Sequence, residues 1–219
     1  MSPRIVPPAP SPPAARSTYR HGDLRRALLD AGIELARDGG PGAVVLREAT
    51  RRVGVVPNAA YRHFGSRQEL LLAVREAALA AAAIAMEKEL AVLPCDQPPA
   101  DFARAQLRAI GTAYLRFAQA EPGLFRTAFV FSDEGSGELG AGKAGASGLD
   151  PFQLLGKAID RLADAGVLDP ARRPNAEYLA WSAVHGLALL IIDGPLRGMD
   201  AEAAHALGQQ VIDMVGRGL

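Results

Sequence analysis

The segment LREATRRVGVVPNAAYRHF, residues 46–64, constrains the fold of this chain more than any other. Its first half is basic with helical spacing, Gly54 follows, and a second helical stretch opens at Pro57. Glycine adopts the left-handed backbone of a tight turn at little cost, and proline suits the first position of a helix. The segment therefore predicts a helix over 45–53, a turn at Gly54 and a helix over 57–64, which is the arrangement of a helix-turn-helix unit.

The rest of the chain also predicts helices. Glycines at 39, 40 and 42 end a helix over 24–37, and Ser66 with Glu69 predicts a capping box that starts a long helix over 67–90. No alternating pattern of a strand occurs, so the fold class is all-α, with an N-terminal three-helix domain and a C-terminal helical bundle. Further helices are expected at 101–120, 151–165, 174–193 and 200–216.

Composition suggests how the chain is divided. Residues 1–18 are rich in Pro, Ser and Ala and predict a disordered arm, residues 19–66 form the helix-turn-helix domain, and residues 67–219 form the second domain. Six glycines within 132–150 predict a mobile loop.

The single cysteine, Cys95, excludes a disulfide within the chain and favours the reducing cytoplasm. No apolar run is long enough to span a membrane, so no membrane partner is expected.

Charge is divided unevenly along a chain whose net charge is zero. Residues 1–67 hold 11 arginines, no lysine and 5 acidic residues, whereas residues 68–219 hold 13 basic and 19 acidic residues. The positive charge therefore lies in the part that holds the predicted helix pair. This is the distribution expected when one end of a protein meets phosphate, and a merely solvated arginine-rich surface is the alternative.

The second helix of the pair carries side chains that suit double-stranded DNA. Asn58 can pair with adenine, and Arg62 with guanine or phosphate. Tyrosine and histidine donate to phosphate oxygens, and an arginine at the start of the next helix suits a phosphate as well. The side chains expected at the DNA are Pro57, Asn58, Ala59, Tyr61, Arg62, His63 and Arg67.

The string VGVVPNAAYRHFGSRQELLLAV, residues 53–74, resembles the N-terminal domain of the TetR (tetracycline-repressor) family of transcriptional regulators. The resemblance covers residues 24–74. It implies that Tyr61, His63 and Arg67 touch phosphate and that Pro57, Asn58 and Arg62 face the major groove. It also implies that Arg47 supports this surface or reaches the DNA backbone.

The sequence departs from the family pattern at the starts of both helices of the pair. The family has Ser or Thr there, and this chain has Val45 and Val56. Loss of a capping side chain costs about 1 kcal/mol, which Pro57 offsets in part by preorganising the second helix. Ala49 and Thr50 replace the usual Ile-Ala pair.

The C-terminal half is similar to the family as well. WSAVHGLA, residues 181–188, and EPGLFRTAFV, residues 121–130, resemble the Trp-His-Gly subgroup of C-terminal ligand-binding domains. The resemblance implies a homodimer whose last helices pair, an unknown small-molecule effector and a palindromic operator. Trp181 and His185 share one helix face, and core packing is favoured over direct ligand contact for both.

A cavity for the effector is expected among the middle helices, because such cavities are mostly apolar with few polar groups. The aromatic and apolar candidates, many of which could equally be core, are Met86, Phe102, Tyr114, Phe117, Phe125, Phe129, Trp181 and His185. No spacing of His and Cys suits a metal, and no cofactor is expected. The alternative function is an all-α carrier or enzyme with a structural N-terminal helix pair, although the sequence shows no catalytic motif.

Overall fold

The computed structural model describes residues 21–130 and 139–219, and every regular element in these two ranges is a helix. The predicted all-α class is therefore confirmed. The expected arm over residues 1–18 and residues 132–138 of the expected loop lie outside the described ranges.

Three helices form the N-terminal end: α1 (His21–Ala43), α2 (Leu46–Val53) and α3 (Pro57–Ala60). The predicted end at residue 37 is too early, because α1 continues to Ala43 and Gly40, with φ of 67°, interrupts it just before Pro41. Phe64 is fully buried beneath this end, and the guanidinium of Arg25 lies 4.8 Å from the centre of its ring. A guanidinium over an aromatic face adds a cation–π attraction to the packing.

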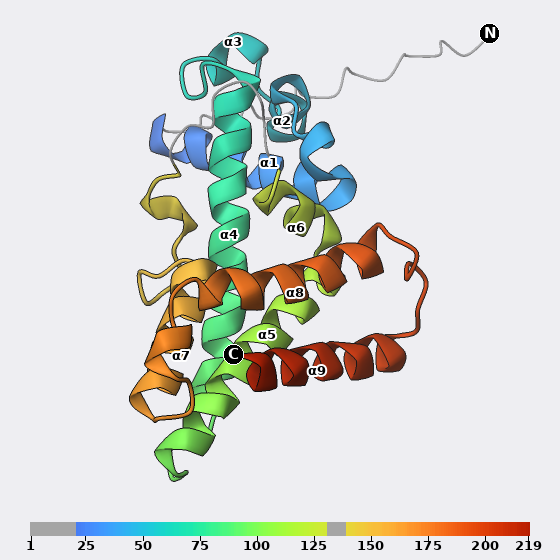
Figure 1. Ribbon diagram of the computed structural model, residues 1–219. Coiled ribbons are helices and arrows are strands. Elements are labelled where there is room, and N and C mark those ends of the chain that lie inside the picture. The colour runs from blue at the N-terminus through green and yellow to red at the C-terminus, as the bar shows by residue number, and fades with distance from the viewer. Residues whose placement is uncertain (1–20, 131–138) are drawn as a thin grey trace, which may run out of the picture.

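Helix α4 (Arg67–Ala91) runs from the N-terminal helices through the C-terminal bundle (Figure 1). Ser66 Oγ accepts a hydrogen bond from the amide of Glu69 at 3.1 Å, as the predicted capping box requires. The Glu69 carboxylate accepts from the amide of Gly65 at 2.7 Å instead of that of Ser66, so the predicted box is shifted by one residue. Leu70 and Val74 join the N-terminal core, and Ala82, Ala83 and Met86 are buried farther along the helix.

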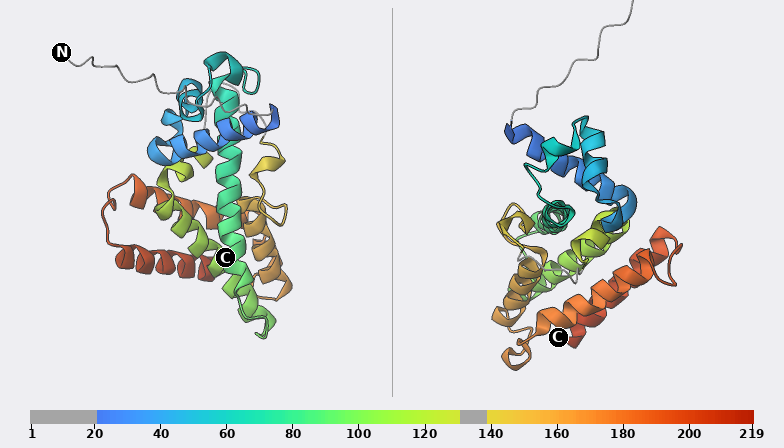
Figure 2. Two further views of the ribbon diagram at one scale, coloured as in Figure 1. Left: turned by 180° about the vertical axis from the view of Figure 1, so that it is seen from behind. Right: turned by 90° about the horizontal axis from the view of Figure 1, so that it is seen from above.

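Five further helices build the C-terminal bundle: α5 (Pro99–Ala120), α6 (Pro122–Ala128), α7 (Pro151–Asp164), α8 (Ala176–Ile192) and α9 (Ala201–Gly218). Helices α8 and α9 lie side by side in opposite directions and pack on α5 (Figure 1). The view from above shows them along one side of the molecule, with their outer surface uncovered (Figure 2).

Residues 139–150, the described part of the expected mobile loop, lie on α4. They include the short 3-10 helix η1 (Ala141–Lys143). The Gly140 amide donates to Glu76 at 2.6 Å, and the Ser147 amide donates to Glu87 at 2.9 Å. A Cβ on Gly142 would lie 2.6 Å from Glu76 Oε2, so glycine allows this close approach. These glycines allow residues 139–150 to lie close to the carboxylates of α4, and the mobility of the segment stays a prediction.

Candidate DNA-binding surface and effector cavity

The turn between α2 and α3 has the predicted geometry. Gly54 is left-handed, with φ of 75° and ψ of 31°, and the amide of Val55 donates to the Thr50 carbonyl at 3.0 Å. Val53 and Val55 are partly buried and pack on the core from either side of the glycine. Helix α3 ends at Ala60 instead of the expected residue 64, and residues 61–63 form a turn.

Neither helix of the pair has a capping side chain. Val45 and Val56 have the extended backbone of an N-cap, but neither provides a side-chain hydrogen bond to its helix. The two valines therefore leave α2 and α3 without a side-chain cap, and the cost of about 1 kcal/mol stays a prediction. Val56 is 69% exposed, so its side chain also contributes little to the core.

Replacing Val56 by threonine should raise the free energy of unfolding by about 1 kcal/mol, because the hydroxyl can accept from a free amide of α3. Urea denaturation of the full chain measures the change. Val56→Ala is the control, since it removes both methyl groups of an exposed valine and adds no acceptor. Equal stability of the threonine and alanine variants would contradict the capping explanation.

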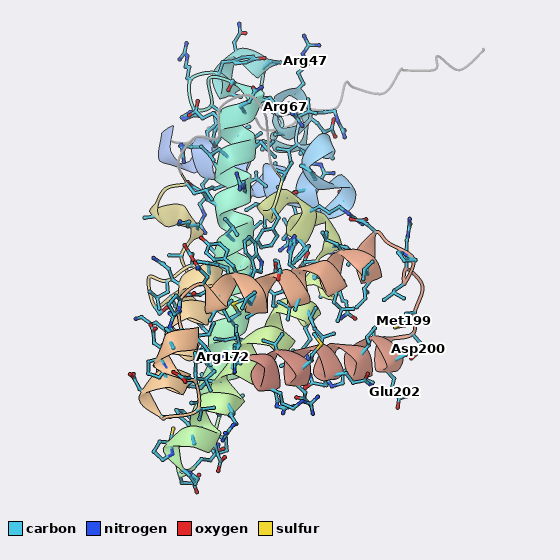
Figure 3. The ribbon with its side chains drawn as sticks, viewed as in Figure 1. Arg47, Arg67, Arg172, Met199, Asp200 and Glu202 are labelled. Carbon is cyan, nitrogen blue, oxygen red and sulfur yellow. The ribbon has the colours of Figure 1, made fainter. Side chains whose placement is uncertain are left out.

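The side chains predicted at DNA gather at the α3 end of the molecule. Pro57, Asn58 and Arg62 are exposed, and Tyr61 is 51% exposed. Ala59 and His63 are half-buried. The structure thus brings the α3 candidates together on one uncovered end, where Figure 3 also places Arg47 and Arg67.

Ion pairs distinguish the arginines of this end. Arg51 lies against the Glu48 carboxylate, and Arg52 Nη2 lies 2.8 Å from Asp38 Oδ2. Arg47 and Arg62 are exposed, and their guanidinium groups make no hydrogen bond or ion pair with the part of the chain that the structure describes. Their charge is therefore available to a phosphate or a base.

The guanidinium of Arg67 is already hydrogen-bonded within the protein. Its Nε donates to the Val44 carbonyl at 2.8 Å, and Nη2 donates to the Pro41 carbonyl at 2.7 Å. These bonds tie the start of α4 to the segment between α1 and α2. A contact of Arg67 with phosphate stays a prediction, and it would have to share the guanidinium with these carbonyls.

A cavity of about 340 Å³ lies within the C-terminal bundle, between α4, α5, α7, α8 and α9. Four predicted residues line it: Met86, Tyr114, Phe129 and Trp181. Phe102, Phe117, Phe125 and His185 are not in its wall. Phe125 is fully buried and packs its ring 5.3 Å from that of Tyr114, so it is core behind the wall.

One hydroxyl joins Trp181 and His185. Trp181 Nε1 donates to Tyr114 Oη at 3.0 Å, and Tyr114 Oη lies 2.7 Å from His185 Nδ1. Burial lowers the pKa of His185, which favours a neutral ring whose Nδ1 accepts a hydrogen bond from the Tyr114 hydroxyl. Burial likewise raises the pKa of Tyr114. Trp181 thus lines the cavity, and His185 acts as a core partner that orients Tyr114.

The prediction missed the charged part of the wall. Arg75, Lys143 and Asp150 line the cavity together with Phe152 and Tyr178. Arg75 follows the start of α4 by two turns and looks in the sequence like a solvated helix residue. Lys143 and Asp150 belong to the glycine-rich segment, and only the folding of that segment onto α4 brings them to the wall.

Helix α6 connects the cavity to the N-terminal helices. Its last residue, Ala128, and the following residue, Phe129, line the cavity, and α6 packs against α1. A Cβ on Gly123 would lie 2.2 Å from the Ala36 carbonyl oxygen, so the two backbones are in contact. Arg126 also forms a two-pronged ion pair with Asp193 at the end of α8, with Nη2 2.6 Å from Oδ1 and Nε 3.0 Å from Oδ2.

A second cavity, of about 400 Å³, adjoins the first, and Ile110 is in both walls. Gln106 lines it and is 5% exposed, and its Oε1 has no hydrogen-bond partner among the described residues. Lys157 and Arg161 lie at its rim.

Within residues 21–130 and 139–219, no cluster of His, Cys, Asp and Glu side chains is arranged to hold a metal ion. In the same ranges no helix is both long enough and apolar enough to cross a membrane.

Two family models match this chain. Residues 28–74 match the model described as bacterial regulatory proteins, tetR family, and residues 107–215 match the tetracyclin repressor-like C-terminal domain. The chain belongs to the TetR family. The family consists of transcriptional regulators, so the class predicted from the helix-turn-helix is confirmed.

Individual proteins are also similar to this chain. The HTH-type transcriptional regulator BetI of Rhizobium meliloti (strain 1021) is 43% identical over 49 residues, which are 22% of this chain and 24% of that protein. The match therefore spans about a quarter of this curated relative. A solved protein of unknown function from Rhodococcus sp. RHA1 is 25% identical with a TM-score of 0.72, covering 93% of this chain and 99% of that one.

The regulator FadR from Bacillus subtilis, solved in complex with stearoyl-CoA, shares the TetR fold. Its TM-score is 0.65 at 12% identity, and the comparison covers 89% of this chain and 98% of that chain. At this identity the likeness concerns the fold alone.

Proposed function

We propose that this TetR-family chain is an effector-responsive repressor that binds a palindromic operator as a homodimer in the cytoplasm. The observation that carries the proposal is the exposed end of α3, where Arg47 and Arg62 have no ion pair in the described chain. Helices α4 and α6 join this end to an apolar cavity. A DNA-binding end and a ligand-sized cavity in one molecule are what an effector-responsive regulator needs.

The proposed contacts with DNA follow from chemistry and exposure. Asn58 and Arg62 read base edges in the major groove, and Pro57 and Ala59 pack along the bases. Tyr61, His63 and Arg47 donate to phosphate oxygens and fix the position of α3. Arg67 contributes to the phosphate from the start of α4. On this proposal residues 19–66 form the DNA-binding domain and residues 67–219 the effector-binding and dimerisation domain.

The proposed dimer interface is the outer surface of α8 and α9. Leu179 is 62% exposed and Leu190 44% exposed on α8, and Met214 is 55% exposed on α9. Exposed large apolar side chains gathered on one surface are typical of protein–protein contacts. Gly186 lies between the leucines along α8, and a Cβ there would meet nothing within 4 Å. A twofold pairing through this surface would present two α3 helices to a palindrome.

The proposed coupling passes through α6. A ligand in the cavity touches Ala128 and Phe129, and α6 contacts α1 through Gly123. If the ligand favours one position of α6, it favours one position of the N-terminal helices. Release of operator by the effector would then reflect the difference in effector affinity between the two arrangements.

We further assign the C-terminal half to the Trp-His-Gly subgroup, supported by the shared contact of Trp181 and His185 with Tyr114.

The alternative is an all-α carrier or enzyme in which the N-terminal helices are only structural. The matched family and the curated relative are transcriptional regulators, which favours the repressor and a non-enzymatic role. Salt separates the two functions. Operator affinity should fall steeply as salt rises, because phosphate contacts release counterions, whereas turnover of a substrate has no reason to follow that slope.

A genomic-fragment pull-down with the purified full chain, followed by gel shift of the recovered fragment against salt, tests the function. Enrichment of a palindromic fragment that the protein retards at nanomolar concentration would support the repressor. Failure to enrich any fragment over random DNA would count against it and favour the alternative.

Arg62→Ala should weaken operator binding roughly 5- to 150-fold and relax sequence preference, because a base contact is lost. Tyr61→Ala should weaken operator and random DNA to a similar extent, because a phosphate contact carries no sequence information. Gel shift on both DNAs measures the two effects. Arg104→Ala is the matched control, an exposed arginine at the far end of α5. Equal loss on both DNAs for Arg62→Ala would contradict its role in reading bases.

A further inference from the structure

The guanidinium of Arg75 is unusual among the groups that line the first cavity. Its Nε donates to the Ala128 carbonyl at 3.0 Å, and no carboxylate of the described chain pairs with it. Burial lowers the pKa of Arg75, which shows that the surroundings disfavour its charge. Other arginines of the bundle, such as Arg126 and Arg173, have acidic partners. A half-buried cation with no acid beside it favours an anion from outside the chain.

The remaining charges of the wall cancel. Lys143 Nζ lies 3.0 Å from Asp150 Oδ2, and Asp150 Oδ1 accepts from the amide of Gln153 at 2.9 Å. The hydroxyl of Tyr114 is already used by Trp181 and His185. The wall therefore carries one uncompensated positive charge, at Arg75, in a lining that is otherwise mostly apolar and aromatic.

We propose that the cavity binds an amphipathic monoanion whose carboxylate pairs with Arg75 and whose apolar body lies against Leu107, Ile110 and Phe152. Because Nε of Arg75 is engaged by Ala128, the two terminal nitrogens remain, and their planar fork matches the two oxygens of a carboxylate. The volume of about 340 Å³ is at the small end of ligand sites, which suits a medium-length chain or a small ring system. This inference rests on the proposed function in treating the cavity as the effector site.

The position of Arg75 also gives the anion a connection to DNA binding. Ala128 is the last residue of α6, and its carbonyl accepts a hydrogen bond from Arg75 Nε. A carboxylate on the two terminal nitrogens would fix the orientation of the guanidinium whose Nε donates to that carbonyl. The acid end of the ligand would thus act directly on the helix that contacts α1.

Trp181 provides a readout that needs no DNA. It is the single tryptophan of the chain and lines the cavity, so its fluorescence reports occupancy there. The full chain is titrated with octanoate, octanamide and octylammonium, which share a chain length and differ in charge. We expect octanoate to bind about tenfold or more tightly than octanamide, and octylammonium to bind weakest. Binding of octanamide as tight as that of octanoate, or no binding of octanoate, would overturn the proposal.

Variants then locate the anion. Arg75→Gln should abolish the preference for octanoate over octanamide, and Arg75→Lys should retain part of it. Arg161→Gln, which removes an exposed arginine at the rim of the second cavity, should leave the preference unchanged. Loss of preference in Arg161→Gln, or its persistence in Arg75→Gln, would overturn the assignment. If circular dichroism shows that Arg75→Gln is unfolded, the affinities of the natural chain for the three ligands still test the proposal. Gel shift of the ligand-free protein tests the repressor separately.

Discussion

Replacing Gly186 by tryptophan should convert the proposed dimer into a folded monomer that no longer binds its operator tightly. Within one chain, nothing lies within 4 Å of a Cβ at this position, so the protomer has room for the side chain. In the proposed dimer, the same side chain would stand between two α8 helices and hold them apart. Operator affinity should fall by orders of magnitude, because each half-site would then be bound independently.

Light scattering after size-exclusion chromatography measures the molar mass of this variant, and gel shift measures its operator binding. Arg104→Trp is the matched control, because it places the same side chain at an exposed site that belongs to α5 and not to the proposed interface helices α8 and α9. Circular dichroism should show unchanged helix content in both variants. A Gly186→Trp protein that remains dimeric would show that the subunits pair through another surface.

Replacing Gly123 by alanine should lower the free energy of unfolding by about 3 kcal/mol. The new methyl group would lie 2.2 Å from the Ala36 carbonyl oxygen and 2.4 Å from that of Arg37. These are backbone atoms of α1, so no side-chain rotation relieves the overlap. The helices must separate, which breaks the packing between α6 and the DNA-binding end.

Urea denaturation and operator binding of Gly123→Ala should both be impaired. Gly42→Ala is a suitable control in the same region, because a Cβ on Gly42 meets nothing within 4 Å and its φ is not positive. That change should stay within about 0.5 kcal/mol of the natural chain. A Gly123→Ala protein as stable as the Gly42→Ala control would mean that α6 does not pack on α1 as closely as described.

The helix-turn-helix was predictable because its signals are local. Gly54 and Pro57 fix backbone geometry within a few residues, and the two valines at 45 and 56 reveal the missing caps before any packing is known. The length of α3 was overestimated, because its sequence is compatible with a helix to residue 64. In the structure, the amides of His63 and Phe64 both donate to the carbonyl of Ala60, which forms a turn.

The charged wall of the cavity was not predictable, because it depends on contacts between distant parts of the sequence. Arg75 meets the Ala128 carbonyl 53 residues later, and nothing near Arg75 in the sequence indicates that partner. The same holds for Arg67 and the carbonyl of Val44, 23 residues earlier. The sequence indicated that the aromatic residues lie in the interior, but not which of them line the cavity and which lie behind its wall. Phe125 was therefore expected at the ligand, and it is a core residue.

The two uncapped helices of the DNA-binding end should also open more readily than the capped start of α4. Amide hydrogens at the starts of α2 and α3 have no side-chain acceptor, whereas α4 begins on a hydrogen bond to Ser66. Deuterium from solvent should therefore replace the amide hydrogens of residues 46–62 much sooner than those in the middle of α4. Exchange should slow in this segment when operator is bound. The part of the protein that recognises DNA would then reach its full rigidity only in the complex.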